Sequence, residues 1–152
     1  YLVAGGHGAL MSAVENAVDD VEAARDGVRE LELGPSDILI ALSASGGTPF
    51  TCAAVDLAAK TGALTVGIAN NDGSPLLAKA EIAIPILTGA EAVAGSTRLK
   101  AATAQKICLN MISTLVMTRL GYVRDGQMIA MKPSNAKLRA RYDRIHGGGD
   151  GD

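Results

Sequence analysis

A continuous apolar run that leads into a loop of small polar residues is the feature that most limits the possible folds of this chain. The run extends from Asp37 to Leu42, and the loop from Ser43 to Thr48 consists of serine, glycine and threonine apart from Ala44. Thr48 followed by Pro49 is typical of the start of a helix, with Thr48 as N-cap. Because a strand that is apolar at every position is typical of parallel sheets covered on both faces, we predict a central parallel strand here.

The same order of strand, loop and helix recurs along the chain. Leu64 to Ala69 is a second buried strand, the polar residues 70–73 follow it, and Ser74-Pro75 begins a short helix that ends near Ala80. A third strand, Ile82 to Ile86, contains a proline that cannot donate a ladder hydrogen bond, which places it towards an edge of the sheet. The first four residues read as the end of a further strand.

Four longer helices are predicted around these strands, in addition to the short one after Ser74. Their ranges are about Ala9 to Leu31, Pro49 to near Gly62, Ser96 to Leu120, and Ser134 to about Ile145. The second half of the Ser96 to Leu120 helix is apolar on almost all sides, which indicates burial or a subunit interface. The alternating pattern predicts an α/β fold, a three-layer doubly wound parallel sheet of about four strands with a long C-terminal helix. We expect one domain over residues 1–121, a helical extension over 122–146 and a disordered tail over 147–152.

Composition excludes several classes of partner. The formal net charge of −2, without a basic stripe interleaved with aromatic residues, argues against nucleic-acid binding. The most apolar stretch, Ile107 to Leu120, contains polar residues and is shorter than the roughly 20 residues of a membrane span. Cys52 and Cys108 fit no metal spacing and indicate reduced thiols, as in the cytoplasm. With only two histidines far apart in sequence, we expect no metal site.

The first candidate site is the loop after the apolar run. Ser43, Ser45 and Thr48 supply three hydroxyls within six residues, and Gly46-Gly47 allow the backbone to approach an anion closely. Ligands of such sheets bind at the carboxyl ends of the strands, where this loop lies. The loop lacks the lysine of nucleotide-binding P-loops, so a monophosphate is favoured over ATP or NAD. A capped helix start with turn glycines has the same composition, and this alternative stays open.

The second candidate site follows the third strand. Glu91, Ser96 and Lys100 lie in a loop and helix start at the same sheet edge. A carboxylate beside an anion site can act as a general base, with the serine and lysine contacting the ligand. In the alternative interpretation Ser96 caps the helix, Glu91 lies near its positive end and Lys100 is solvated.

Three segments together resemble one known family. Residues 43–50 (SASGGTPF), 89–106 (GAEAVAGSTRLKAATAQK) and 109–114 (LNMIST) are similar to the N-acetylmuramic acid 6-phosphate etherases of the sugar isomerase (SIS) superfamily. The resemblance implies a flavodoxin-like phosphosugar-binding domain over residues 1–121 that forms a homodimer. It also implies cleavage of the lactyl ether of N-acetylmuramate 6-phosphate to N-acetylglucosamine 6-phosphate and D-lactate during peptidoglycan recycling, a reaction that requires no metal and no redox cofactor.

The chain departs from the family at the catalytic carboxylates. The family's first strand, its first phosphate loop and the glutamate after it map upstream of Tyr1, and a second catalytic glutamate maps onto Val18. Glu15, three residues before Val18, is the nearest substitute, and Glu91 is the other candidate catalytic carboxylate. We therefore expect this chain alone to be inactive or nearly so. An aldose–ketose phosphosugar isomerase that uses Glu91, and a non-catalytic phosphosugar-binding module, remain the alternative functions.

Overall fold

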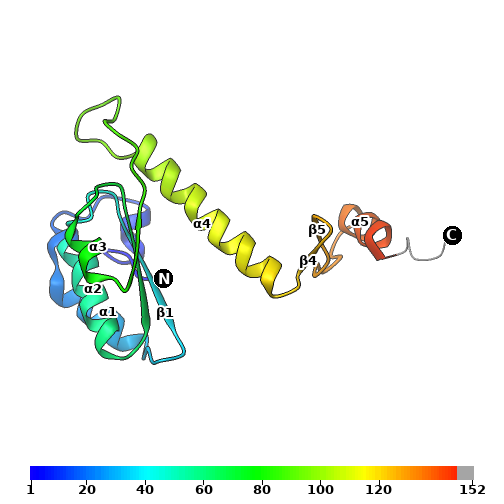
Figure 1. Cartoon of the computed structure of the whole chain (residues 1–152), viewed down its shortest axis with the longest axis horizontal. Coiled ribbons are helices and arrows are strands. Elements are labelled where there is room, and N and C mark those ends of the chain that lie inside the picture. Colours follow the sequence, from blue (N-terminus) through cyan, green and yellow to red (C-terminus); the bar gives the residue numbers. More distant parts are fainter. Residues whose placement is uncertain (147–152) are drawn as a thin grey trace. The chain divides into compact units, whose positions relative to one another are not determined.

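The computed structural model describes residues 1–146, and it divides into two units that we treat separately, Tyr1–Lys106 and a second unit that begins at Ile107 (Figure 1). The tail that was predicted to be disordered, residues 147–152, lies outside the described residues.

A three-stranded parallel sheet forms the centre of the first unit. Its strands are β1 (Ile38–Ser43), β2 (Leu64–Ala69) and β3 (Ile82–Pro85), in the spatial order β1-β2-β3. The register places Ser43 beside Ala69, so the carboxyl ends of β1 and β2 meet at one edge. The predicted α/β class with a parallel sheet is confirmed, and so is the edge position of β3, whose proline needs no ladder partner.

Two expectations about the sheet are wrong. The sheet has three strands instead of about four, because residues 1–4 pair with no strand, and Leu2 instead packs on the core and against Gly27. Within the described chain β1 is an edge strand, since β2 pairs on both sides and β1 on only one. Ile38 is 59% exposed and Ile40 37% exposed, whereas Ala41 and Ser43 on the other face are buried. An apolar run therefore identified the strand but not its place in the sheet.

The predicted helix from Ala9 to Leu31 is also wrong in its first half. Two short 3-10 helices, His7–Leu10 and Ala17–Asp19, precede α1 (Val21–Glu30). Asn16 adopts a left-handed conformation at φ 59°, which a continuous right-handed helix excludes. The Asp20 side chain then accepts a hydrogen bond from the backbone N–H of Ala23 at 2.9 Å and fixes the start of α1.

The helices α2 (Pro49–Lys60) and α3 (Pro75–Lys79) begin where predicted, each with proline at the first helical position. Figure 1 shows α1, α2 and α3 gathered beside the strands. Small side chains pack α2 closely on α1, and Val55 of α2 and Leu76 of α3 are fully buried in a neighbouring cluster. This packing holds the β1–α2 and β2–α3 connections side by side at the carboxyl edge of the sheet.

The long helix α4 (Lys100–Arg119) begins four residues later than the predicted Ser96 and belongs to the first unit only in its first two turns. The second unit continues with an antiparallel hairpin, β4 (Val123–Arg124) and β5 (Gln127–Met128), that was not predicted. Its turn, Asp125-Gly126, has positive φ at both residues, as short hairpin turns require. The helix α5 (Ala136–His146) confirms the last predicted helix. Within residues 1–146, none of the helices combines the length and the apolar character that a membrane span requires.

Candidate functional site

Three hydroxyl groups converge at the end of β1. The buried Ser43 Oγ lies 2.8 Å from Thr48 Oγ1 and 3.3 Å from Ser45 Oγ. Thr48 was predicted to cap α2, and it occupies the N-cap position, but its hydroxyl bonds to Ser43 and not to the helix backbone. We call Ser43, Ser45 and Thr48 the hydroxyl cluster. It has the composition of a site for one small anion, because each hydroxyl can donate one hydrogen bond.

The backbone of the loop is only partly available to a ligand. Gly46 donates its N–H to Ser43, at 3.0 Å to the Oγ atom and 3.1 Å to the carbonyl oxygen, and Gly47 donates to Ser45 Oγ at 3.2 Å. The sequence predicted that the two glycines bring the backbone close to an anion, but in the structure both glycine N–H groups are already bonded within the loop. The N–H groups of Ser45 and Thr48 donate to no atom within the described part of the chain. An anion would thus meet hydroxyls first and the glycine amides only after the loop exchanges hydrogen bonds.

The β2–α3 connection fixes the shape of this loop. Asn70 N–H donates to Ala44 O at 3.0 Å, and Asn71 Nδ2 donates to the carbonyls of Ala44 and Ser45, each at 3.3 Å. Leu76 N–H donates to Gly46 O at 2.8 Å. Three consecutive loop carbonyls therefore point towards the β2–α3 connection. The sequence predicted that Asn70 and Asn71 lie at the same sheet edge as the hydroxyl cluster, but it did not predict their hydrogen bonds to this loop.

Glu91 is held by the start of α4. Its carboxylate accepts hydrogen bonds from the backbone N–H groups of Lys100 and Ala101 at 3.0 Å, while Lys100 Nζ donates to Ala90 O at 2.7 Å. The backbone N–H of Ala101, followed by that of Lys100, lowers the pKa of Glu91. Ser96 lies half-buried in the turn before the helix. The geometry therefore fits a helix-capping carboxylate better than a general base, and the cap comes from Glu91 and not from Ser96.

We expect the pH to control this cap with a definite sign. A lowered pKa in the folded state means that the cap contributes above the ordinary glutamate value of about 4.3 and is lost as the pH falls through the lowered value. The amide proton resonances of Lys100 and Ala101 should shift together over that acidic window. NMR titration measures this shift, which should be absent in Glu91→Gln and unchanged in the control Glu30→Gln. If the amide resonances of Lys100 and Ala101 shifted with pH in Glu91→Gln as they do in the wild type, Glu91 would not be the cap.

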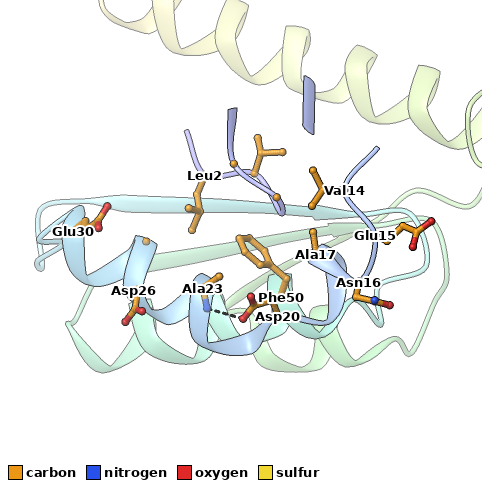
Figure 2. A pocket seen from close by; sticks show the side chains of 14 residues that line it. Leu2, Val14, Glu15, Asn16, Ala17, Asp20, Ala23, Asp26, Glu30 and Phe50 are labelled. Carbon is orange, nitrogen blue, oxygen red and sulfur yellow. Dashed lines mark hydrogen bonds between the residues drawn. The ribbon is translucent and has the colours of Figure 1, made fainter. Parts of the chain in front are cut away.

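Glu15 lies at a different place. A hollow of about 580 Å³ between the N-terminal segment and α1 has Leu2, Val14, Glu15 and Phe50 among its lining residues (Figure 2). The carboxylates of Asp20, Asp26 and Glu30 also line this hollow, which makes it a poor site for a phosphate. Val18 is 53% exposed and is not part of the lining. No hydrogen bond of the described chain connects Glu15 to the hydroxyl cluster.

The ligand set of a metal ion is absent from residues 1–146, where no group of three or more His, Cys, Asp or Glu side chains is arranged to hold one. The candidate site is the hydroxyl cluster together with the β1–α2 and β2–α3 connections that form it, because three hydroxyl groups converge there at the carboxyl edge of the sheet.

Comparison with known proteins identifies the family of this chain. The SIS domain family model matches residues 9–115, which include the hydroxyl cluster and Glu91. Curated relatives named N-acetylmuramic acid 6-phosphate etherase are 47% identical in Deinococcus radiodurans, 49% in Streptomyces coelicolor and 47% in Lactobacillus gasseri, each over 95% of this chain.

The alignment covers 47%, 46% and 48% of these three relatives, so the chain spans about half of their length. The family model, in contrast, matches well over half of this chain. On the strength of that match and of the parallel α/β sheet that carries the hydroxyl cluster, the chain belongs to the SIS domain family.

Proposed function

We propose that the hydroxyl cluster binds the phosphate of a sugar phosphate in a lyase that cleaves N-acetylmuramate 6-phosphate to N-acetylglucosamine 6-phosphate and D-lactate. The observation that carries this proposal is the convergence of Ser43, Ser45 and Thr48 at the carboxyl end of β1, in a chain nearly half identical to the etherases. The same site serves carbohydrate metabolism and peptidoglycan recycling in this proposal, because its ligand is a cell-wall sugar phosphate. Gly46 and Gly47 allow the backbone to approach the anion closely. Ser96, in the β3–α4 connection, and Lys100, at the start of α4, contact the sugar in this proposal.

The reaction needs acid–base chemistry at two neighbouring sugar carbons. In the open-chain sugar the aldehyde acidifies the proton on C2, and a carboxylate removes it. The electron pair forms a C2=C3 double bond while the lactyl oxygen leaves C3 and takes up a proton, which releases D-lactate. Water then adds to C3 and C2 regains a proton, so one water is consumed overall. A phosphate anchored at a fixed point contributes by holding C2 and C3 against the acid and base.

The two candidate carboxylates divide into different roles. Glu91 accepts hydrogen bonds from the N–H groups of Lys100 and Ala101, so we propose that it positions the β3–α4 connection and does not transfer protons. Glu15 is exposed and lines the hollow beside the N-terminal segment, and it is the proposed proton acceptor of this chain. The proposed chemistry needs one carboxylate as acid and one as base, and Glu91 is engaged with the backbone, so residues 1–152 alone should be inactive or nearly so.

The complete gene product should release D-lactate from N-acetylmuramate 6-phosphate in equal amount to N-acetylglucosamine 6-phosphate. A coupled D-lactate assay measures the release, and Glu15→Gln should reduce it by roughly 100-fold or more if Glu15 is the general base. The control Glu30→Gln should retain the rate. Tight binding of the sugar phosphate without release of lactate would refute the lyase and leave the binding site in place.

That second outcome corresponds to a non-catalytic phosphosugar-binding module. The observation that favours it is Val18, an apolar residue where the family resemblance places a catalytic glutamate. Sugar-phosphate binding with neither lactate nor an isomerised sugar as product identifies this function.

We further propose a homodimer in the cytoplasm. The second unit's part of α4 and the residue that follows it expose large apolar side chains, among them Ile107, Met111 and Leu115 in the helix and Leu120 directly after it, each at least half exposed in the described chain. Such a surface is typical of a subunit interface. The two free thiols, Cys52 and Cys108, support a reducing compartment. Sedimentation velocity should give twice the mass of one chain, and a single-chain mass at micromolar concentration would contradict the dimer.

A further inference from the structure

Ser74 carries a buried hydroxyl group without a partner. The residue is 6% exposed, and its Oγ atom makes no hydrogen bond within residues 1–146. Ser74 precedes α3, yet its side chain does not cap that helix. Burial of an unpaired hydroxyl costs free energy, and such a group in a native structure calls for an explanation, such as a water, an ion or a ligand that supplies the missing bond. The position of Ser74 therefore needs an explanation outside the packing of the unit itself.

The hydroxyl lies directly behind the loop of the hydroxyl cluster. A Cβ atom added to Gly46 would be 2.1 Å from Ser74 Oγ, so the absence of a side chain at Gly46 is what lets the two residues meet. Ser43 Oγ lies on another side of the same glycine, 3.0 Å from its N–H. The Ser74 hydroxyl and the hydroxyl cluster are thus separated by the backbone of one residue.

The hydrogen bonds of Gly46 show which contact a bound anion would displace. The N–H of Gly46 is shared between the Oγ and the carbonyl oxygen of Ser43, at 3.0 and 3.1 Å. When the Ser43 side chain rotates so that Oγ donates to an anion, Oγ leaves this N–H, which then keeps only its bond to the Ser43 carbonyl oxygen. Gly46 has a positive φ of 70° and no side chain, so the peptide plane that carries its N–H can turn without moving a side chain, while the Gly46 carbonyl oxygen keeps its 2.8 Å bond to the N–H of Leu76. Such a turn would open a path from the anion to Ser74 Oγ.

We propose that Ser74 is a fourth hydroxyl of the phosphate site and donates its hydrogen bond to a phosphate oxygen of the bound sugar phosphate. This inference rests on the proposed phosphosugar site and adds to it a residue from the β2–α3 connection. The phosphate is then held from two connections at once, by the hydroxyl cluster after β1 and by Ser74 after β2. Ser74 is a ligand-binding residue in this account and has no part in proton transfer.

The substitution Ser74→Ala separates this role from a structural one. It removes an atom that has no partner in the described chain, so the melting temperature without ligand should stay the same or rise. The affinity for N-acetylglucosamine 6-phosphate should fall roughly 10- to 100-fold, as expected for one hydrogen bond to a charged group. Inorganic phosphate should lose affinity by a similar factor, because the lost contact is to the phosphate and not to the sugar.

Thr65→Val is the matched control. Thr65 is equally buried, but its Oγ1 accepts the N–H of Glu81 at 3.0 Å, at the opposite end of β2 from the hydroxyl cluster. This variant should melt at a lower temperature and bind sugar phosphate like the wild type. The two variants are thus expected to have opposite signatures in calorimetric titration and thermal melting of the complete gene product.

The outcomes distinguish the inference from the function on which it depends. Unchanged affinity in Ser74→Ala, with normal binding by the wild type, overturns the role of Ser74 and leaves the phosphosugar site intact. A lower melting temperature with unchanged affinity identifies Ser74 as a structural hydroxyl and overturns the inference equally. Failure of the wild type to bind either probe overturns both the site and the inference.

Discussion

Gly46→Ala is expected to lower the stability of the first unit and to abolish ligand binding. The new methyl group would lie 2.1 Å from Ser74 Oγ, 2.4 Å from Ser74 Cβ and 3.0 Å from Ala69 Cβ. The clash should cost about 1–3 kcal/mol and the positive φ about 1–2 kcal/mol more. Differential scanning calorimetry should show a fall in melting temperature of roughly 5–15 °C. Ligand affinity should be lost because the displaced loop no longer brings its hydroxyls together.

Gly47→Ala provides the control for this prediction, since both glycines belong to the same loop. A Cβ atom at Gly47 would meet nothing nearer than Ser45 Oγ at 4.0 Å, and its φ lies outside the left-handed range. This variant should therefore melt close to the wild type. In the double variant Gly46→Ala with Ser74→Gly, part of the lost stability should return, because the two closest clashing atoms are gone. Equal effects of the two single glycine variants would contradict the close contact between Gly46 and Ser74.

Ser43→Ala is the second substitution with a large expected effect. The Ser43 hydroxyl bonds to both other members of the hydroxyl cluster and accepts the N–H of Gly46, so it is the central atom of the loop. Its removal should lower the free energy of unfolding by about 1–3 kcal/mol. Affinity for N-acetylglucosamine 6-phosphate should fall by roughly 100-fold or more, since one charge-assisted bond is lost and Thr48 and Ser45 lose their alignment.

Calorimetric titration and thermal melting measure the two effects of Ser43→Ala on the same preparation. Thr61→Ala is the matched control, because Thr61 also donates its hydroxyl to an atom of the chain, Ala58 O at 2.8 Å, but at the far end of α2. It should lose some stability and no affinity. If Ser43→Ala bound the sugar phosphate as well as Thr61→Ala does, the hydroxyl cluster would not be the phosphate site.

The parts of the fold that the sequence predicts well are those fixed by local physical rules. Continuous apolar runs identified β1 and β2, and Thr48-Pro49 and Ser74-Pro75 identified the starts of α2 and α3. These signals act within a few residues, so no knowledge of distant partners is needed. The edge position of β3 was predictable for the same reason, because Pro85 restricts its own hydrogen bonding.

Features that depend on distant contacts were not predictable. The edge position of β1 depends on which strands pair with it, and the apolar sequence of a strand does not show how many neighbours it has. The hydrogen bonds of Asn71 join residues 26 and 27 positions apart, and the Gly46–Ser74 contact is of similar range.

The start of α1 was wrongly predicted for a local reason. In the segment before α1, helical spacing of apolar residues was present, but the left-handed Asn16 and the Asp20 cap decided where the helix begins.

At the candidate site the sequence predicted the residues but not their connections. Ser43, Ser45 and Thr48 do converge, yet their hydroxyls and the glycine amides bond to one another in a way that only the folded loop defines. Glu91 was expected beside a ligand and is occupied by two backbone N–H groups of α4. These bonds arise from a loop of eight residues between Glu91 and α4, whose path no local propensity determines.

The most direct test of the phosphate site is a calorimetric titration of the complete gene product with N-acetylglucosamine 6-phosphate and, separately, with N-acetylglucosamine. We expect saturable binding of N-acetylglucosamine 6-phosphate and an affinity for N-acetylglucosamine that is weaker by at least roughly 100-fold, because the phosphate supplies several charge-assisted hydrogen bonds. Equal affinity for the two sugars, or heat of binding for neither, would contradict the phosphate site.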